Sequence, residues 1–318
     1  MICATSCGSG PSVEPTPVIE GPTVSCPSDV SVIAHAGQQP TVSFDTPIAS
    51  KGSAPITIVC MPASGTQFPN GTTTITCEAT DSRQHKGSCT FSVIVTPIPQ
   101  LAKTTFLAFG DSLTEGKTAS LLPTIVKVPP NTTNFSTSYV EQLNTKLSQR
   151  YQDQTIILIA FGKGAEQAGE GKLRLRDNWG LFVPNPDAML LLEGINDLLQ
   201  IETASAAGMA SAIDSVIDAL RYDIGTARGH GTRVFLATLP PVTPPKPANV
   251  VAAVPVLNTR IQALAAEQNV TLVDLYTAMD SSLVGSDGLH LKPEGYGAVA
   301  DEWMKAIQAA LEVTTVAP

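Results

Sequence analysis

Three shortages in the sequence restrict what this protein can do. Basic residues are fewer than acidic ones, 19 against 28, and the net charge of −9 argues against nucleic acid or an anionic membrane surface as a partner. No apolar run approaches the roughly 18 residues that a membrane-spanning helix needs, so no transmembrane segment is predicted. No two cysteines have the C-x-x-C spacing typical of zinc sites, so we expect no metal, and no motif suggests another cofactor.

Cysteine is absent after residue 89, and the six cysteines are Cys3, Cys7, Cys26, Cys60, Cys77 and Cys89. Because their spacings are not those of metal ligands, the cysteines indicate disulfides formed in an oxidising compartment. We therefore expect an extracytoplasmic protein that is secreted, periplasmic or attached to the cell surface. The opening "MICATSCGSG" is too short for a complete signal peptide and is interpreted as the remnant of one. Its "ATSC" resembles a bacterial lipoprotein cleavage site, which makes Cys7 a candidate for a lipid anchor.

Composition divides the chain into three parts. Residues 1–22 are interpreted as the signal remnant and a tether, because residues 8–22 are rich in Pro, Gly and Ser and lack periodicity, which is typical of an extended linker. Residues 23–97 alternate short Thr-, Val- and Ile-rich segments with turn signals and predict a small all-β sandwich. Residues 98–318 consist of continuous apolar runs separated by helical stretches. The 318 residues, 43% of them hydrophobic, are sufficient for two ordered domains.

The all-β segment carries a distinctive run, "FPNGTTTITCEATD", from Phe68 to Asp81. With "VSCPSDVSV" before it and "CTFSVIV" after it, residues 24–95 resemble the hyalin repeat (HYR) module, which has an immunoglobulin-like fold. The resemblance implies the disulfide Cys26–Cys89, because HYR modules with only two cysteines have them at the matching positions. It then implies that the remaining pair is bridged as Cys60–Cys77. Modules of this kind are generally adhesive or spacing elements.

The C-terminal part alternates apolar runs with helical patterns. Five runs have the continuous hydrophobicity of strands buried on both faces of a parallel sheet: 104–110, 155–162, 188–194, 233–240 and 270–276. Helical stretches are predicted at 136–151, 204–229, 254–269 and 293–312. This alternation predicts a three-layer α/β sandwich with a five-stranded parallel sheet and right-handed crossovers.

Polar residues and glycine follow several of these strands, at the edge where ligands of an open parallel sheet bind. Ser112 follows the first strand, Gly162 ends the second, Asn196 follows the third, and Asp287 and His290 come after the fifth. Each has a simpler interpretation as a cap, a turn or a surface residue. A coincidence that brings all of them to one edge is much less probable than any one of these simpler interpretations taken alone. We therefore interpret the residues together as a site.

The base of this site follows by elimination. Only two of the four histidines lie in the α/β part, and His230 stands before the fourth strand, at the opposite edge of the sheet. His290 is therefore the one imidazole expected at the ligand edge, and Asp287, three residues earlier, can orient its ring.

The motifs "FGDSLTEG", "GIND" and "SDGLH", in this order with Gly162 between the first two, resemble the SGNH (GDSL) hydrolase family over residues 103–312. The resemblance implies a flavodoxin-like SGNH fold, with Ser112 as nucleophile and a Ser112–His290–Asp287 triad. It also implies an oxyanion hole made by the N–H groups of Ser112 and Gly162 and the side-chain amide of Asn196. One departure is Ala160, where the family often has asparagine two residues before the glycine.

We therefore expect a secreted serine esterase that needs no cofactor and hydrolyses short, acetyl-type esters, with an acetylated polysaccharide as the candidate substrate. One alternative is a lipase, lysophospholipase or thioesterase acting on longer acyl chains, since "LLPTIV" within the insertion 117–136 could form an apolar wall. The other is a catalytically inactive surface adhesion protein. The intact set of polar residues at the strand ends counts against that last alternative.

Overall fold

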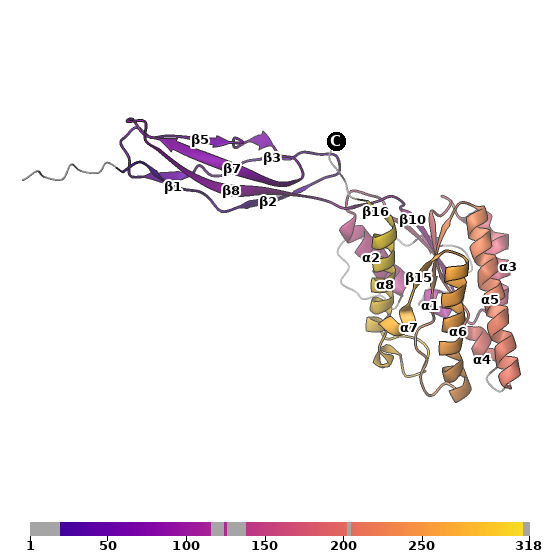
Figure 1. Cartoon of the computed structure of the whole chain (residues 1–318). Helices are drawn as coiled ribbons and strands as arrows, with labels where there is room; N and C mark the ends of the chain where they lie inside the picture. The colour runs from indigo at the N-terminus through magenta and orange to yellow at the C-terminus, as the bar shows by residue number, and fades with distance from the viewer. Residues whose placement is uncertain (1–19, 116–123, 126–137, 202–204, 314–318) are drawn as a thin grey trace, which may run out of the picture. The chain divides into compact units, whose positions relative to one another are not determined.

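The computed structural model describes residues 20–115, 124–125, 138–201 and 205–313 and divides at Pro97–Ile98 into two compact units (Figure 1). Cys3 and Cys7, including the predicted lipid anchor, lie outside the described residues, as does most of the insertion 117–136. None of the described helices is both long and apolar enough to span a membrane.

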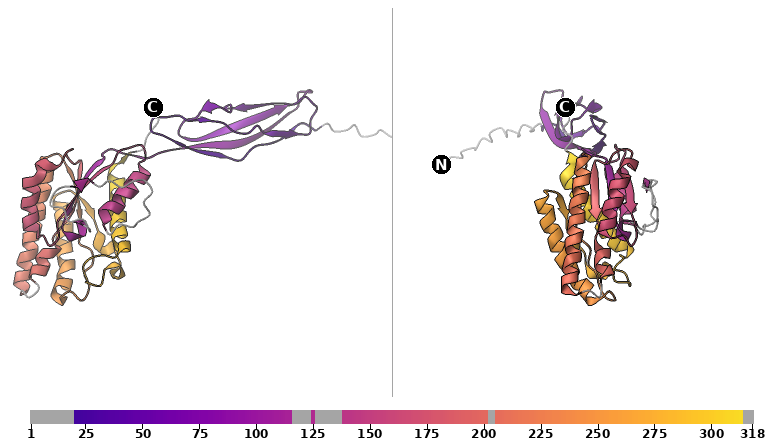
Figure 2. Two further views of the ribbon diagram at one scale, coloured as in Figure 1. Left: turned by 180° about the vertical axis from the view of Figure 1, so that it is seen from behind. Right: turned by 90° about the vertical axis from the view of Figure 1, so that its right-hand side faces the viewer.

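The N-terminal unit consists of β-strands, as predicted. Its strands are drawn in indigo and violet in Figure 2. The largest sheet has the order β2-β8-β7-β5, in which β2 and β8 are parallel and the other pairs antiparallel. The strands of this sheet are β2 (Val30–Ala34), β5 (Thr57–Met61), β7 (Gly71–Thr80) and β8 (Lys86–Pro97). Two smaller antiparallel pairs are β1 (Thr23–Ser25) with β4 (Ile48–Ser50), and β3 (Thr41–Val42) with β6 (Thr66–Gln67).

Burial alternates along β7 and β8, so one face of this sheet packs into a small core that includes Phe68, Ile75 and Phe91. The structure contains both disulfides, Cys26–Cys89 and Cys60–Cys77. Cys60 and Cys77 are directly opposite each other on β5 and β7, and Cys77 is also opposite Cys89 on β8. The two disulfides therefore meet at one level of the sheet.

The C-terminal unit contains the predicted five-stranded parallel sheet, in the order β12-β10-β13-β14-β15. These strands are β10 (Thr105–Gly110), β12 (Ile157–Gly162), β13 (Ala188–Leu192), β14 (Arg233–Ala237) and β15 (Thr271–Val273). Every residue of β10 and β13 is buried, as expected for strands covered on both faces. The short strand β11 (Thr124–Ile125), which the sequence did not predict, adds an antiparallel edge beside β12.

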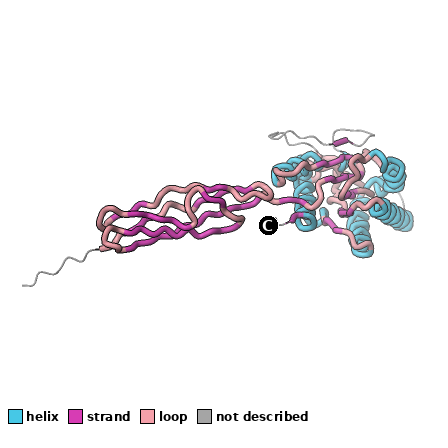
Figure 3. Tube along the Cα trace, turned by 90° about the horizontal axis from the view of Figure 1, so that it is seen from above, coloured by secondary structure: helices cyan, strands magenta, loops and turns pink. Residues whose placement is uncertain are grey.

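Helices cover both faces of this sheet (Figure 3). On one face α2 packs against α8, and on the other α5 packs against α3 and α6. The long helices are α2 (Tyr139–Arg150), α3 (Ala168–Asn178), α5 (Ala206–Gly229), α6 (Ala248–Glu267) and α8 (Pro293–Leu311). The shorter helical elements are α1 (Ser112–Glu115), α4 (Ile195–Gln200), α7 (Leu275–Ala278), η1 (Trp179–Leu181) and η2 (Ser281–Leu283). The pair β9 (Gln100–Leu101) and β16 (Glu312–Val313) joins the two ends of this unit.

Two helices differ from the prediction. Helix α6 begins at Ala248, before the expected start at residue 254, and includes Pro255 in its first turns. Helix α3 was not predicted, because its sequence is rich in charge and contains Gly169 and Gly171, both unfavourable for a helix interior. A Cβ at Gly171 would lie 3.3 Å from Glu193 Oε2 and 3.4 Å from Glu166 Oε2, so glycine lets α3 approach these buried carboxyl groups.

Candidate active site

The nucleophile candidate stands where β10 turns into α1. Asp111, which is fully buried, accepts a hydrogen bond from the Leu113 N–H on its side chain (2.9 Å), while its carbonyl accepts from the Thr114 N–H (3.1 Å). Asp111 is therefore the residue that caps α1, and the Ser112 hydroxyl is not used as a cap. A Cβ at Gly110 would lie 1.9 Å from the Leu192 carbonyl oxygen, so only glycine allows the strand to end there.

His290 and Asp287 come to Ser112 on one loop. His290 Nε2 lies 3.0 Å from Ser112 Oγ, and its Nδ1 lies 2.6 Å from Asp287 Oδ2. The other carboxylate oxygen accepts the backbone N–H groups of Leu289 and His290, both at 3.0 Å. The loop is fixed from outside, because the Thr243 N–H donates to the Gly288 carbonyl (2.9 Å). The geometry places the three predicted side chains in one continuous chain of hydrogen bonds.

The charge on Asp287 sets the tautomer of the imidazole. Burial raises the pKa of Asp287, but the hydrogen bonds from the His290 side chain and from the two backbone N–H groups outweigh it, so the pKa lies below the ordinary value of 3.8. An ionised carboxylate can only accept, so His290 Nδ1 carries the proton. Nε2 is then left with a lone pair toward the Ser112 hydroxyl.

Asn196 lies buried in the first turn of α4, after β13. Its Nδ2 donates to the Glu166 carbonyl (2.9 Å), and the side chain of the next residue, Asp197, accepts the Ala168 N–H (2.9 Å). These bonds tie the end of the third strand to the segment that follows β12. The second N–H of the Asn196 amide has no acceptor among the described residues, which suits it to donate to a ligand.

Gly162 is positioned differently from the prediction. At the start of β12, the Ile157 N–H donates to the Thr104 carbonyl (2.9 Å). Just after its end, the Lys163 N–H donates to the Gly110 carbonyl (3.0 Å), so both N–H groups point toward β10. Because N–H groups alternate in direction along a strand, the N–H of Gly162 points away from β10, toward the β11 side. A Cβ at this position would lie 2.2 Å from the Glu115 N atom. Glycine is thus required because α1 packs on it, and its N–H is not directed toward Ser112.

The turn 163–166 lies beside Ser112 instead. A Cβ at Gly164 would be 3.9 Å from Ser112 Cβ and 2.6 Å from Glu115 Oε2. Ala165 has a φ of 59°, a left-handed conformation that costs a non-glycine residue roughly 1–2 kcal/mol. The backbone N–H groups of Gly164 and Ala165 donate to no acceptor within the described ranges. The second glycine of "FGKGA" was the only sequence signal for this turn.

Residues 108–298, more than half of the chain, match the GDSL-like lipase/acylhydrolase family. The chain belongs to this family. Residues 19–95 are a HYR domain, so both predicted resemblances are confirmed, and the protein is a carboxylic ester hydrolase.

Solved structures show which proteins the hydrolase is similar to in fold. The hydrolase is similar to an acetylxylan esterase from Geobacillus stearothermophilus, with 17% identity, a TM-score of 0.51, and coverage of 65% of this chain and 95% of that one. A lipase/acylhydrolase from Enterococcus faecalis has 21% identity and a TM-score of 0.48, and the match covers 65% of this chain and 97% of that one. No curated protein matches the chain.

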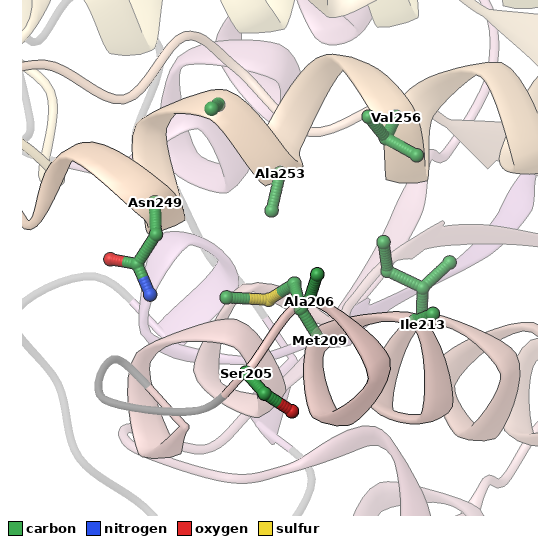
Figure 4. Close-up of a pocket in the computed structure, with 9 residues that line it drawn as sticks. Ser205, Ala206, Met209, Ile213, Asn249, Ala253 and Val256 are labelled. Carbon is green, nitrogen blue, oxygen red and sulfur yellow. The ribbon is translucent and has the colours of Figure 1, made fainter.

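A groove elsewhere on the hydrolase is not part of this site. It has a volume of about 390 Å³ and lies between α5 and α6, where Met209, Ile213, Ala253 and Val256 give it an apolar lining (Figure 4). None of the side chains in the Ser112 site lines it. In the described ranges, no three His, Cys, Asp or Glu side chains are grouped as ligands for a metal ion.

Asp111, Glu193 and Asp223 are buried carboxyl groups of the hydrolase unit. Burial raises the pKa of Asp111 to about 7, although the hydrogen bond from the Leu113 N–H acts in the opposite direction. Burial also raises the pKa values of Glu193 and Asp223 well above their ordinary values. Neither carboxyl has a hydrogen-bond partner among the described residues. Burial therefore favours the neutral, protonated form of all three carboxyl groups.

Raising the pH from about 5 to about 8 is expected to lower the melting temperature of the C-terminal unit. Asp111, Glu193 and Asp223 have higher pKa values when folded, so their contribution to stability is complete below the unfolded values of 3.8 and 4.5. It is lost as the pH rises toward the folded values, about 7 for Asp111. The two tryptophans, Trp179 and Trp303, both lie in this unit, so their fluorescence during heating reports its unfolding.

The variants Glu193→Gln and Asp223→Asn should make this melting temperature less dependent on pH, because each removes a titrating group. The exposed Asp301→Asn is the matched control and should leave the pH dependence as it is in the wild type. Groups with lowered pKa values, such as Asp287, change the stability only below about pH 4. They therefore do not affect the pH dependence of the melting temperature between pH 5 and 8. A melting temperature that rises between the two pH values would contradict the prediction.

Proposed function

We propose that the hydrolase cleaves carboxylic esters through a Ser112–His290–Asp287 triad. The observation that carries the proposal is the hydrogen-bonded chain of these side chains, with spacings of 3.0 and 2.6 Å. Ser112 Oγ attacks the ester carbonyl while His290 Nε2 accepts its proton, and Asp287 stabilises the imidazolium. His290 then returns the proton to the leaving alcohol. Water, activated by the same imidazole, releases the acid from Ser112.

The oxyanion of the tetrahedral intermediate needs donors on the far side of the carbonyl. We propose the Ser112 N–H, in the first turn of α1, and the second N–H of the Asn196 amide. In place of the predicted Gly162, the third donor belongs to the turn 163–166, whose Gly164 lies beside Ser112. The strained φ of Ala165 is consistent with a backbone held in place for such a role.

Short acyl groups on a carbohydrate alcohol are the proposed substrate class. The Geobacillus protein with a similar fold is named an acetylxylan esterase, and this chain has only 5% aromatic residues with which to line a long acyl tunnel. The carboxylate of Glu115, next to Gly164 and Ser112, gives the site a polar wall suited to sugar hydroxyls. The HYR domain and two disulfides support a location outside the cytoplasm.

The substrate class is tested with p-nitrophenyl acetate, butyrate, octanoate and palmitate, together with acetate release from acetylated xylan. We expect kcat/KM to fall steeply beyond butyrate, because a short pocket excludes longer acyl chains and so cannot gain the about 0.8 kcal/mol that each buried methylene contributes. We also expect acetate release from xylan to disappear in Ser112→Ala. Activity that rises through octanoate, with no acetate released, would favour the lipase alternative. Absence of hydrolysis on every ester would favour the inactive adhesion protein.

A further inference from the structure

A single guanidinium group, that of Arg174 on α3, contacts the backbone behind the active site. Its Nη2 donates to the Gly110 carbonyl (3.2 Å), and its Nη1 donates to the Phe161 carbonyl (3.1 Å). The first carbonyl ends β10, two residues before Ser112, and the second lies at the end of β12. Arg174 thus joins the carboxyl ends of two neighbouring strands.

The same group holds the side chain of Glu166. Arg174 Nε lies 2.9 and 2.8 Å from the two carboxylate oxygens, and Nη2 lies 2.5 Å from one of them. The carbonyl of Glu166 is the acceptor that fixes the Asn196 amide. Through Glu166, Arg174 is therefore connected to the turn 163–166 and to the side chain of Asn196, which is proposed to hold the oxyanion.

Both members of this ion pair are removed from water. The Glu166 side chain is fully buried and that of Arg174 is 11% exposed. The guanidinium carbon lies 4.5 Å from the Phe109 ring centre and 4.1 Å from that of Phe161. Only a planar guanidinium can stack on these rings and still donate in three directions, so a lysine ammonium does not replace it.

We propose that Arg174 is a positioning residue, which holds Ser112, the turn 163–166 and Asn196 in the relative positions that the transition state requires. The inference rests on the proposed function. Arg174 touches no reacting atom and acts through the Gly110 carbonyl, the Phe161 carbonyl and Glu166. Its loss should weaken interactions made in the transition state and leave the binding of the ester in its ground state nearly unchanged.

The test compares Arg174→Ala and Arg174→Lys with the wild type on p-nitrophenyl acetate. For both variants we expect kcat to fall about 10- to 100-fold while KM stays within about threefold. Low millimolar guanidinium should restore part of the kcat of Arg174→Ala by entering the vacated space. Urea, which has a similar shape and no charge, should not.

Arg150→Ala is the matched control. Arg150 also forms a two-bond ion pair, with Glu312 at 2.8 Å, but it ends α2 at the opposite edge of the sheet. This variant should lower the melting temperature and leave kcat unchanged. If Arg174→Ala does not fold, Arg174→Lys, which keeps the charge opposite Glu166, decides the question.

Three outcomes would overturn the inference. The first is an Arg174 variant that folds and keeps kcat within twofold of the wild type. The second is a loss of kcat that Arg150→Ala shows to the same extent, and the third is rescue by urea as good as rescue by guanidinium. An inactive wild type overturns the proposed function and the inference with it, whereas an active wild type with a fully active Arg174→Ala overturns the inference alone.

Discussion

Replacing Ser112 by alanine is expected to lower kcat on p-nitrophenyl acetate by about 10⁴- to 10⁶-fold, and His290→Ala should do the same. The two side chains act as one unit, since the hydroxyl becomes a nucleophile only when His290 Nε2, 3.0 Å away, accepts its proton. The double variant should therefore be little worse than either single one. Asp287→Asn should also lower kcat, because an amide in its place no longer fixes the tautomer of His290.

Initial rates and a melting curve by tryptophan fluorescence measure catalysis and folding separately. His230→Ala is the matched control, because the His230 ring stacks on Trp179 at a centroid distance of 4.6 Å, at the other edge of the sheet. It should reduce stability and retain kcat. A folded Ser112→Ala variant with kcat within tenfold of the wild type would refute the triad.

Asn196→Ala is expected to lower kcat by about 10²- to 10³-fold, the usual effect of removing one oxyanion donor. The amide is held by its bond to the Glu166 carbonyl, so its second N–H is already oriented when the oxyanion forms. KM should change little, because the ground-state carbonyl oxygen carries less charge than the oxyanion. The measurement is kcat and KM on p-nitrophenyl acetate.

Asn258→Ala controls for the loss of a buried amide. Asn258 is also buried and exchanges two hydrogen bonds with the Leu239 backbone, at 2.8 and 3.0 Å. Its replacement should lower the melting temperature without a comparable loss of kcat. Equal losses of kcat in the two variants would show that Asn196 acts only through stability.

The parts of the structure that the sequence predicted are those that depend on burial and on strand ends. β10 and β13 are visible as apolar runs because they are buried on both faces. The closeness of Ser112 and His290 follows from topology, because all carboxyl ends of a parallel sheet meet at one edge.

The parts that the sequence did not predict depend on tertiary contacts. The direction of the Gly162 N–H follows from the hydrogen-bond register with β10, which no local pattern encodes. Ala165 adopts a left-handed φ that alanine ordinarily avoids, so its residue type gives no turn signal. Arg174 lies in a helix whose charged, glycine-containing sequence is atypical, and its partners come from three other segments.

Parallel pairing between β2 and β8 gives the HYR domain resistance to stretching. A load that pulls the chain before Cys26 and after Pro97 enters β8 through the Cys26–Cys89 disulfide. It pulls the end of β8 along the direction of β2, so it shears the hydrogen bonds between the two strands together instead of opening them one after another. The Cys26–Cys89 disulfide carries the same load covalently, because it closes a loop with a sequence separation of 63. Only the short segments outside that loop can be drawn out, so the domain keeps its length under tension.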